Sequence, residues 1–319
     1  MIDDLMAGTK KKVLVAGGAG FIGSCIVDML VEAGYRVRVV DDLSSGKTQN
    51  IMRHMGTEYF DFIQGNIVDK NIAEKSVEGV DAVVNMVGKG DLAKSVENPM
   101  LYHETNLTGN LSLLIAASRK KIKKFVFASS GAVYTAKAIG VISETAEYGP
   151  DSPYGATKVC SEIYLKTFNA VYGMECVCLR FFNVYGPRRE NSTYGGAVTN
   201  FMLSVMNGKE VTIFGTGDDK RDYVYVKDIA SAVILALKDG VSGEFNVGTG
   251  AGTSTSELLS KIEKAVKKKA KVVKAPKRKG DSPSRIANIE KIGKALGYKP
   301  KYTLEKGLEE LKEYLDNRK

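Results

Sequence analysis

A tyrosine followed four residues later by a lysine can do acid–base chemistry, because a nearby cation favours the deprotonated phenol. The sequence holds this pair three times, at Tyr154/Lys158, Tyr223/Lys227 and Tyr302/Lys306. Tyr154 directly follows Pro153, which is typical of the first turn of a helix, so Lys158 falls one turn later on the same face. Tyr223 lies in a strand-like run, and Tyr302 precedes the last helical pattern. We therefore predict Tyr154 and Lys158 as the catalytic pair; the alternative is two half-exposed helix residues.

Electrostatics decides whether Tyr154 can act as a base near neutral pH. The pKa of its phenol must fall from about 10 by about three units, which corresponds to roughly 4 kcal/mol. One cation at about 4 Å contributes about 4 kcal/mol when the effective dielectric constant is about 20. We therefore expect Lys158 to lower the pKa of Tyr154.

Two serines offer a hydroxyl partner for this tyrosine. Ser129 and Ser130 follow an apolar, strand-like run at residues 124–128. Doubly wound sheets bind ligands at the carboxyl ends of their strands. Ser130 is therefore predicted to hydrogen-bond the substrate hydroxyl that Tyr154 deprotonates. The alternative is that both hydroxyls only form a turn.

A glycine-rich turn points to a dinucleotide. The run GGAGFIG places Gly17, Gly20 and Gly23 between an apolar strand pattern and a helical pattern. Such glycines allow a tight turn and close approach to a pyrophosphate, which the helix N-terminus attracts. Asp41 ends the next strand pattern, where a carboxylate accepts from the adenosine ribose. Because Asp42 adds a second carboxylate and no arginine adjoins it, we predict NAD rather than NADP.

Strand-like and helical patterns alternate over about the first 180 residues. The strand-like runs lie at residues 13–16, 37–40, 59–63, 80–87, 125–128 and 176–182. Alternation of this kind requires right-handed crossovers between parallel strands, with helices on both faces of the sheet. The sequence therefore predicts an α/β fold with a doubly wound, Rossmann-type parallel sheet.

The second half of the chain consists of shorter elements broken by glycines. We expect residues 1–180 to form an NAD-binding Rossmann domain and residues 181–319 a smaller α/β domain that binds the substrate. Strand segments around residues 222–248 are candidates to rejoin the first domain. Neither a repeat of 20 to 50 residues nor a low-complexity linker separates the halves, so we expect a shared cleft.

Composition and charge exclude several other classes of protein. The 319 residues are 44% hydrophobic and 26% charged, which is typical of a globular protein. We find no apolar run near the roughly 20 residues of a membrane helix and no secretory signal, so we expect a cytoplasmic protein without a membrane partner. Four cysteines and two histidines predict no metal site.

The formal net charge of +9 comes from one segment. Residues 261–279 hold ten Lys or Arg and one Glu, and 10 − 1 = 9. The same segment carries an apolar helical stripe that begins at the capping pair Ser254 and Glu257, which makes most of these lysines a solvated face. We therefore expect no nucleic-acid partner.

The motifs together resemble a known family. GGAGFIG, the strand-end Asp41, FASSGAVY, SPYGATK and LRFFNVYGPR occur in the order seen in extended short-chain dehydrogenase/reductases, the NAD-dependent epimerases and dehydratases. FGTGDDKRDYVYVKD, FNVGTG and RKGD continue the resemblance through the second half. Within the family the chain is most similar to the UDP-glucose 4-epimerases, which implies an isomerase with a nucleotide-sugar substrate and a homodimer packed through helices near residues 98–119 and 154–172.

The resemblance also implies residue roles. Around NAD it places, besides Tyr154, Lys158 and the glycines named above, Phe21, Ile22, Asp41, Asp42, Ser44, Ser45, Gly46, Asn66, Ile67, Val87, Gly88, Lys89, Asn106 and Phe182. Around the substrate it places Ser130, Tyr154, Asn183, Val198, Arg221, Arg278 and Asp281. Asn66 replaces a more usual aspartate near adenine, where its amide oxygen can still accept, and Arg285 lies in the region that gates the sugar C2 substituent.

The implied reaction inverts the C4 hydroxyl of the sugar through a 4-keto intermediate, interconverting UDP-glucose and UDP-galactose. Dehydratases carry an acidic pair where this chain has Gly131 and Ala132, and glucuronate epimerases usually have threonine at Asn183. Epimerases of UDP-N-acetylhexosamines or UDP-glucuronate, a 4,6-dehydratase, a 4-keto reductase and a non-catalytic sensor of NAD or nucleotide sugars stay open as alternatives.

Overall fold

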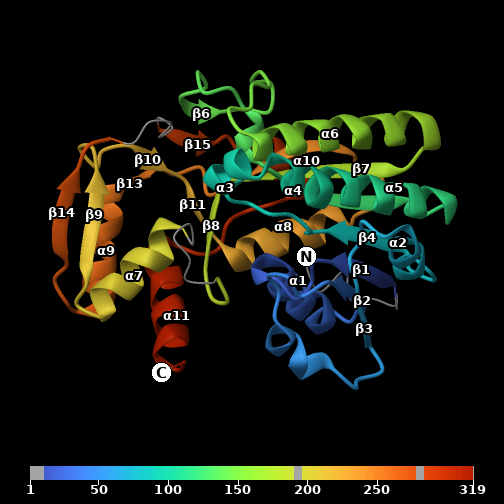
Figure 1. The fold of residues 1–319 in the computed structure, drawn as a ribbon, viewed down its shortest axis with the longest axis horizontal. Coiled ribbons are helices and arrows are strands. Elements are labelled where there is room, and N and C mark those ends of the chain that lie inside the picture. The colour runs from blue at the N-terminus through green and yellow to red at the C-terminus, as the bar shows by residue number, and fades with distance from the viewer. Residues whose placement is uncertain (1–10, 190–195, 278–283, 319) are drawn as a thin grey trace.

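A seven-stranded sheet forms the centre of the larger part of the molecule (Figure 1). The computed structural model describes residues 11–189, 196–277 and 284–318. The strand order is β12-β7-β5-β4-β1-β2-β3, and all six pairings are parallel. The strands are β1 Lys12–Ala16, β2 Arg36–Asp41, β3 Phe60–Gln64, β4 Ala82–Asn85, β5 Lys124–Ser130, β7 Glu175–Phe181 and β12 Gly243–Val247. The predicted doubly wound Rossmann-type fold is confirmed.

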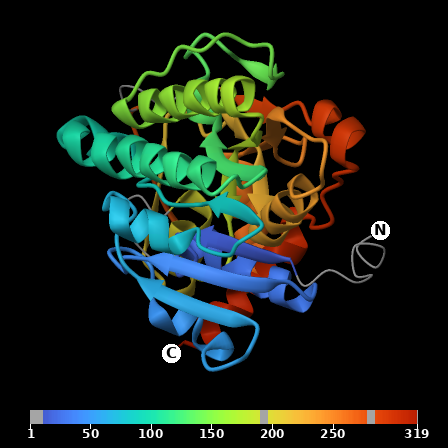
Figure 2. The ribbon, with the colours of Figure 1, turned by 90° about the vertical axis from the view of Figure 1, so that its right-hand side faces the viewer.

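Helices cover both faces of this sheet because its strands are apolar on both sides. Val13 and Val15 belong to one buried cluster, whereas Leu14 and Ala16 belong to another. Successive residues of a strand point to opposite faces, so the two clusters lie on either side of the sheet. Helices α1 (Phe21–Glu32) and α8 (Val226–Ala236) pack together on the first side. Helices α2 (Lys70–Ser76), α5 (Gly109–Arg119) and α6 (Pro153–Tyr172) cover the second side, where Figure 2 shows α5 and α6 running side by side.

The chain reverses its direction across the sheet between β1 and β4. From β1 the order runs through β2 to β3 at one edge, and the chain then returns to β4 on the other side of β1. A ligand crevice forms at the carboxyl ends of the strands at such a switch point. Several short helices follow these ends: η2 Thr48–Asn50, η3 Met52–His54, α3 Leu92–Glu97, α4 Pro99–Tyr102, the π-helix η4 His103–Thr108 and η5 Gly131–Val133.

The smaller part is built from three small sheets and their helices. Strands β13 (Thr253–Ser254), β10 (Lys220–Arg221), β15 (Arg285–Ala287) and β6 (Gly140–Ile142) form one sheet in that order. The other two are the pairs β11 (Tyr223–Tyr225) with β8 (Asn183–Tyr185), and β14 (Lys271–Ala275) with β9 (Glu210–Phe214). Its helices are α7 Ala197–Met206, α9 Thr255–Val266 and α11 Leu304–Asp316, whereas α10 Glu290–Leu296 packs against β12 and α8 of the larger part.

Strand β12 comes from the second half of the chain but pairs with β7 in the large sheet. Helix α8 also returns to that sheet and packs on α1. The two halves of the sequence are therefore interleaved in space, and the division into domains at residues 180 and 181 stays a prediction.

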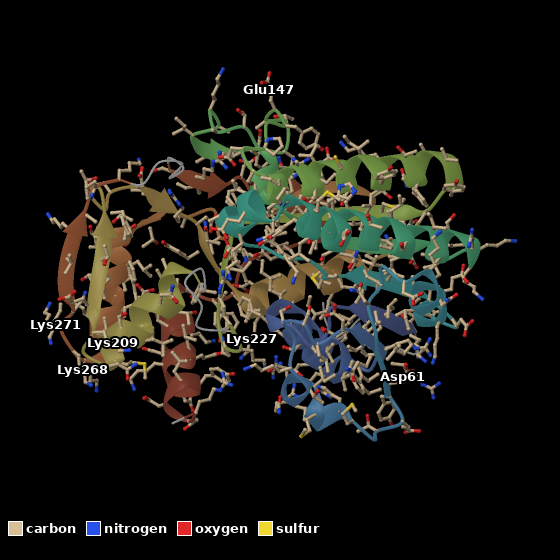
Figure 3. The ribbon with its side chains drawn as sticks, in the orientation of Figure 1. Asp61, Glu147, Lys209, Lys227, Lys268 and Lys271 are labelled. Atoms are coloured by element: carbon tan, nitrogen blue, oxygen red, sulfur yellow. The ribbon has the colours of Figure 1, made fainter. Side chains whose placement is uncertain are left out.

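The basic segment lies at the outer edge of the smaller part, where Figure 3 labels Lys268 and Lys271. Ser254 caps α9 by accepting a hydrogen bond from the Glu257 N–H, as predicted. The apolar stripe of α9 is buried at Leu258, Leu259, Ile262 and Val266. The lysines after α9 are exposed, which matches the predicted solvated face.

Two features are absent from residues 11–189, 196–277 and 284–318. No helix there is both long enough and apolar enough to cross a membrane. No group of three or more His, Cys, Asp or Glu side chains there is arranged to hold a metal ion. Cys176 and Cys178 are buried in β7, in agreement with a packing role.

Candidate active site

The glycine turn joins β1 to α1 and leaves the first turn of the helix open to a ligand. Gly17 has a φ of 76°, and a Cβ there would lie 2.9 Å from the Val87 amide nitrogen. A Cβ on Gly23 would lie only 2.1 Å from the Gly17 carbonyl oxygen, so no side chain fits. Gly20 is the N-cap of α1 and supplies no side-chain cap. The N–H groups in the first turn of α1, which follow this glycine turn, are therefore placed to bind an anion such as a pyrophosphate.

Asp41 ends β2 and faces the glycine turn. One carboxylate oxygen accepts a hydrogen bond from the Ala19 N–H at 3.0 Å, and the other accepts from the Leu43 N–H at 2.9 Å. Gly46 packs so closely that a Cβ there would lie 2.9 Å from both oxygens. Burial raises the pKa of Asp41, and the two N–H donors act against that rise. Each oxygen keeps a lone pair for a ribose hydroxyl, whereas a 2′-phosphate would be repelled.

The loop after β4 is fixed by Asn106, which lies buried in the π-helix η4. The amide oxygen of Asn106 accepts from the Lys89 N–H at 2.8 Å, and its amide nitrogen donates to the Lys89 carbonyl at 3.1 Å and to Thr157 at 3.2 Å. A Cβ on Gly88 would lie 3.2 Å from the Lys158 ammonium nitrogen. Asn106 therefore ties this loop to helix α6, which carries the predicted catalytic pair.

Most of the predicted cofactor residues follow the carboxyl ends of strands or lie in η4, whereas Asp41 is the last residue of β2 and Tyr154 and Lys158 lie in α6. Asn66 was expected to accept a hydrogen bond from adenine through its amide oxygen. That oxygen already accepts from the Val68 N–H at 2.9 Å. The set divides into Phe21 and Ile22 in α1, Ser44 to Gly46 after β2, Asn66 and Ile67 after β3, Val87 to Lys89 after β4, Asn106 in η4 and Phe182 after β7. Their contacts with NAD stay predictions.

Tyr154 and Ser130 meet at the end of β5. Tyr154 is the second residue of α6, after Pro153 at N1, and the Ser152 hydroxyl caps the helix by accepting from the Gly155 N–H at 3.2 Å. The Ser130 side chain lies near the Tyr154 phenol, where it acts to lower the pKa of that phenol. Ser130 also accepts from the Ala132 N–H at 3.1 Å, which fixes its hydroxyl. The two side chains therefore lie at the same end of β5, while the predicted hydrogen bond from Ser130 to the substrate hydroxyl stays a prediction.

Lys158 is buried one turn further along α6, with an exposed fraction of 4%. Its ammonium donates to the Ala128 carbonyl at 2.7 Å and lies 5.9 Å from the centroid of the Tyr154 ring. Burial lowers the pKa of Lys158 to about 8, while the carboxylate of Glu162 acts in the opposite direction. A lysine with this pKa gives up its proton at a pH where an ordinary lysine does not.

The expectation that Lys158 lowers the pKa of Tyr154 is wrong. The pKa of Tyr154 is raised, because burial of the phenol outweighs the hydrogen bond from Ser130 and the charge of Arg189. The Lys158 ammonium is directed to the Ala128 carbonyl instead of the phenol oxygen. The cation that acts on Tyr154 is Arg189, which the sequence reasoning missed.

The predicted substrate residues are spread over the small sheets. Asn183 begins β8 with an exposed side chain, and Arg221 in β10 lies beside Arg285 in β15. Val198, the second residue of α7, has its side chain buried in the core, and its predicted contact with the substrate stays a prediction. Arg278 and Asp281 lie outside the described residues.

A buried ion pair that the sequence reasoning missed supports this site from behind. Arg180 in β7 donates to both carboxylate oxygens of Glu162 in α6, at 3.0 and 2.7 Å. The same carboxylate accepts from Ser129, next to Ser130, and from Tyr148 at 2.7 Å. Arginine within the apolar run of β7 and glutamate four residues after Lys158 were the signals in the sequence.

Asp222 is a second fully partnered carboxylate that sequence reasoning missed. It is buried and accepts from the backbone N–H groups of Thr249, Gly250 and Ala287 at 2.8, 3.0 and 3.2 Å. It also accepts from the Thr249 hydroxyl at 2.6 Å. These bonds fix the strand that carries Arg221 against the loop after β12, so Asp222 joins the small sheet to the large one.

The fold and these side chains define an enzyme that works with a dinucleotide, and comparisons with known proteins agree. The model of the NAD-dependent epimerase/dehydratase family matches residues 13–248. A UDP-glucose 4-epimerase of Mycolicibacterium smegmatis is 35% identical, over 96% of this chain and 99% of its own.

Two solved structures share nearly the whole fold. The UDP-glucose 4-epimerase of Thermotoga maritima, solved with UDP-glucose, has a TM-score of 0.91 and 38% identity, over 96% of this chain and 99% of its own. A UDP-N-acetylglucosamine 4-epimerase of Methanobrevibacter ruminantium, solved with UDP-N-acetylmuramic acid, has a TM-score of 0.91 and 34% identity, over 98% and 100%.

The chain belongs to the NAD-dependent epimerase/dehydratase family. The resemblance stated from the motifs is therefore confirmed, as are an enzyme of the epimerase class and NAD as its cofactor.

Proposed function

We propose that this protein interconverts UDP-glucose and UDP-galactose by inverting the C4 hydroxyl of the sugar. The observation that carries the proposal is that Tyr154 and Ser130 meet at the carboxyl end of β5, beside the buried Lys158. An acid–base tyrosine at this edge of a doubly wound sheet can take a proton from a hydroxyl bound over the glycine turn.

The side chains divide the work. Tyr154 accepts the proton from O4 and later returns it, while Ser130 orients the hydroxyl by hydrogen bonding. Lys158 places an ammonium group, which can lose its proton near pH 8, close to the Tyr154 ring. Asp41 and the first turn of α1 bind the cofactor. When bound, NAD supplies the hydride acceptor and donor for C4. If the 4-keto sugar rotates within the site between the two steps, it presents its other face to the same groups. The hydroxyl is then re-formed with inverted stereochemistry.

Two arginines support a nucleoside diphosphate as the part of the substrate that the protein binds. Arg221 and Arg285 are paired across β10 and β15, and their like charges suit a diphosphate. Arg285 donates to the Thr135 carbonyl at 2.9 Å, while its Nε is buried without a hydrogen-bond partner in the described part of the protein. This N–H is therefore free to donate to a ligand. The named relatives act on or bind UDP sugars, which favours uridine.

A UDP-N-acetylhexosamine is the second candidate substrate. The Methanobrevibacter ruminantium relative is a UDP-N-acetylglucosamine 4-epimerase with 34% identity. Gly131 carries no side chain where dehydratases carry an acid, and its Cβ position meets only the Phe182 ring at 3.6 Å. Proton NMR of the purified protein with UDP-glucose and UDP-N-acetylglucosamine separates the two candidates by showing which C4 centre inverts.

The decisive variant is Tyr154→Phe, which removes only the phenolic oxygen. We expect a fall of at least about 100-fold in turnover, because an acid–base group is lost, with binding of the nucleotide sugar retained. The matched control is Tyr164→Phe, which removes the same atom from the exposed side of the same helix. Unchanged turnover in Tyr154→Phe would refute the proposed function.

We also propose a homodimer packed through α3 to α6. Apolar side chains gather on these helices with large exposed fractions, including Val96 at 64%, Met100 at 66%, Ile163 at 52% and Val171 at 65%. Exposed apolar patches of this kind mark interfaces between subunits. Light scattering should give the mass of two chains, and Met100→Lys together with Ile163→Lys should shift it towards one. A monomer in the unaltered protein would contradict this proposal.

A further inference from the structure

The hydroxyl of Thr157 joins two helical elements at the edge of the candidate site. Thr157 lies in α6 between Tyr154 and Lys158, and its exposed fraction is 6%. The hydroxyl donates to the Tyr154 carbonyl at 2.7 Å and accepts from the Asn106 amide nitrogen of η4 at 3.2 Å. Because a hydroxyl has one proton to donate, its donor is committed to the tyrosine backbone. Thr157 therefore connects the backbone of the reacting residue with a second element.

The backbone of Lys89 fixes the direction of these hydrogen bonds. A backbone N–H can only donate, so the Asn106 atom that lies 2.8 Å from the Lys89 nitrogen is the amide oxygen. The amide nitrogen then donates to the Lys89 carbonyl at 3.1 Å and to the Thr157 hydroxyl. Exchanging the two amide atoms would set donor against donor and acceptor against acceptor at Lys89. The hydrogen bonds therefore run from Asn106 through Thr157 to Tyr154.

The loop after β4 packs against the glycine turn. A Cβ on Gly17 would lie 2.9 Å from the Val87 amide nitrogen. At the start of the loop, the Asn85 side chain accepts from the same Val87 N–H at 3.0 Å. Asparagine side chains therefore hold residues 87–89 at both ends, beside the turn that leads into the cofactor site. The hydrogen bond to Thr157 connects this fixed loop to α6.

A second threonine of α6 shows which part of this arrangement is ordinary. Thr167 donates to the Ile163 carbonyl at 3.0 Å, as threonine often does within a helix, and its side chain is exposed. The bond from Thr157 to Tyr154 is of the same local kind. The bond that Thr157 accepts from another element at a buried position is not explained by local helix structure. Losing a partner there leaves a buried donor unsatisfied, which is costly.

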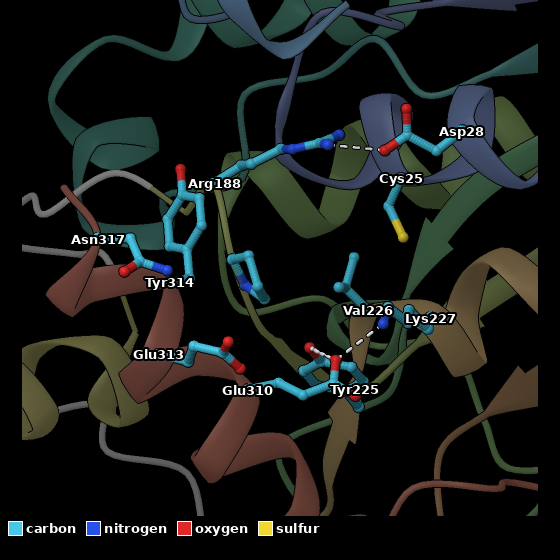
Figure 4. A pocket seen from close by; sticks show the side chains of 11 residues that line it. Cys25, Asp28, Arg188, Tyr225, Val226, Lys227, Glu310, Glu313, Tyr314 and Asn317 are labelled. Atoms are coloured by element: carbon cyan, nitrogen blue, oxygen red, sulfur yellow. Dashed lines mark hydrogen bonds and ion pairs between the residues drawn. The ribbon is translucent and has the colours of Figure 1, made fainter. Parts of the chain in front are cut away.

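Helix α1, which follows the glycine turn, is held by separate contacts. Arg188 pairs with Asp28 of α1 at 2.7 Å, at the edge of a cavity of about 470 Å³ (Figure 4). Thr157 and Asn106 are not among the described residues that line this cavity. Removing the Thr157 hydroxyl should therefore alter the loop after β4 and leave the Arg188 contact unchanged, which provides a control.

We propose that Thr157 is a positioning residue for the reaction, whose hydroxyl fixes the backbone of Tyr154 relative to the loop after β4. The inference rests on the proposed function, in which Tyr154 exchanges a proton with O4 while C4 exchanges a hydride with NAD. Both transfers act on one carbon and its oxygen, so the tyrosine must keep its position relative to the cofactor site. A shift of about 1 Å can lower such a rate by about 100-fold.

The first measurement is the turnover of Thr157→Val, which replaces the hydroxyl by a methyl group of similar size. We expect kcat to fall by about 10-fold while KM changes by less than about twofold, because the bound substrate meets a displaced tyrosine. Thr157→Ser keeps a hydroxyl and should retain most of kcat. Thr167→Val is the matched control, since it loses a bond to a helix carbonyl away from the loop, and its kcat should not change.

The second measurement is hydrogen exchange of the NAD-loaded protein, followed by mass spectrometry. In Thr157→Val the Asn106 amide loses an acceptor, so the backbone amides of residues 86–90 should exchange about 10-fold faster. They should keep their original rate in Thr157→Ser and in Arg188→Gln, which breaks the contact with Asp28. Unchanged exchange in the central strands shows that a variant is folded, and Thr157→Ala replaces the valine variant if that variant is not.

Three results would overturn the inference. The first is an unchanged kcat in the folded variant without the hydroxyl, and the second is a fall in kcat that also occurs in Thr157→Ser. The third is a fall in kcat without faster exchange of residues 86–90, because the loop would then not be involved. Faster exchange in a protein that epimerises no nucleotide sugar would support the connection through Thr157 while refuting the proposed function.

Discussion

Two groups of buried charges lie near the end of β5, and they are partnered in different ways. In the rear pair, Arg180 and Glu162 bond to each other through two hydrogen bonds, and Tyr148 and Ser129 complete the carboxylate. In the front group, Lys158 donates to the Ala128 carbonyl and Arg189 donates to the Val184 carbonyl. The rear charges therefore satisfy each other within the fold, whereas the hydrogen-bond acceptors of the front charges are neutral backbone carbonyls.

The largest effect is expected from Glu162→Gln, which breaks the rear pair. Removing one partner leaves the Arg180 guanidinium buried without an opposite charge, which costs about 3–5 kcal/mol of the free energy of unfolding. Chemical denaturation measures this loss. Glu290→Gln is the control, because that glutamate forms an exposed pair with Lys294 and its loss should cost less than about 0.5 kcal/mol. Equal losses in both variants would remove the distinction between the two sides.

Lys158→Met tests the front side and should separate activity from stability. We expect roughly a 100-fold loss of turnover, about 2.7 kcal/mol, because a charge near the reacting tyrosine is removed. The unfolding temperature at neutral pH should not fall, since a cation that burial disfavours has been removed. Lys166→Met, on the exposed side of the same helix, is the control for both measurements.

The pH dependence of the free energy of unfolding tests whether folding lowers the pKa of Lys158. The pKa of Lys158 is lowered from 10.5 to about 8 on folding. Between these values the unfolded chain holds a proton that the folded protein lacks, so stability rises with pH across this window. As the pH rises from 8 to 10.5, the unaltered protein should therefore become more stable relative to Lys158→Met. A constant difference would show that Lys158 is charged normally in the folded protein.

The smallest effect is expected at the cap of α6. Ser152→Ala removes the hydroxyl that accepts from the Gly155 N–H, which costs about 1 kcal/mol of stability. Turnover should fall by a smaller factor than in Tyr154→Phe, because the first turn that holds Tyr154 loosens without losing the phenol. Ser152→Asp keeps a capping oxygen and should restore most of both properties. A loss that Ser152→Asp does not restore would show that the cap is not the cause.

The regular part of the fold could be predicted from sequence because its signals are local. Apolar runs such as that of β1, and a glycine turn with a helix after it, are read from neighbouring residues, and Tyr154 and Ser130 were brought together by the rule that ligands bind at strand ends. Strands of two or three residues, such as β10 and β8, are too short to show the alternation of apolar and polar residues that identifies a strand. The position of β12 beside β7 depends on a pairing 66 residues apart, from Val177 to Gly243.

The part of the site that sequence reasoning missed is set by tertiary contacts. Arg180 meets Glu162 across two elements, Asp222 meets N–H groups of two distant loops, and Arg189 meets the Phe21 ring from the opposite half of the chain. The predicted direction of the pKa shift of Tyr154 is wrong for the same reason. Distance to a cation was inferred from helix spacing, but the burial of the phenol was not visible in the residue order.

The π-helix of residues 103–108 carries a consequence for insertions and deletions in this region. Each residue of a helix turns the chain by about 100°. Deleting one residue from this wider turn would convert it to a regular helix and rotate everything before it, including α3 and α4, relative to α5. Asn106 would then face away from the Lys89 backbone, and the apolar helices that precede it would present another side to solvent. A single register step thus links the loop after β4, which Asn106 holds, to the outer surface of the molecule.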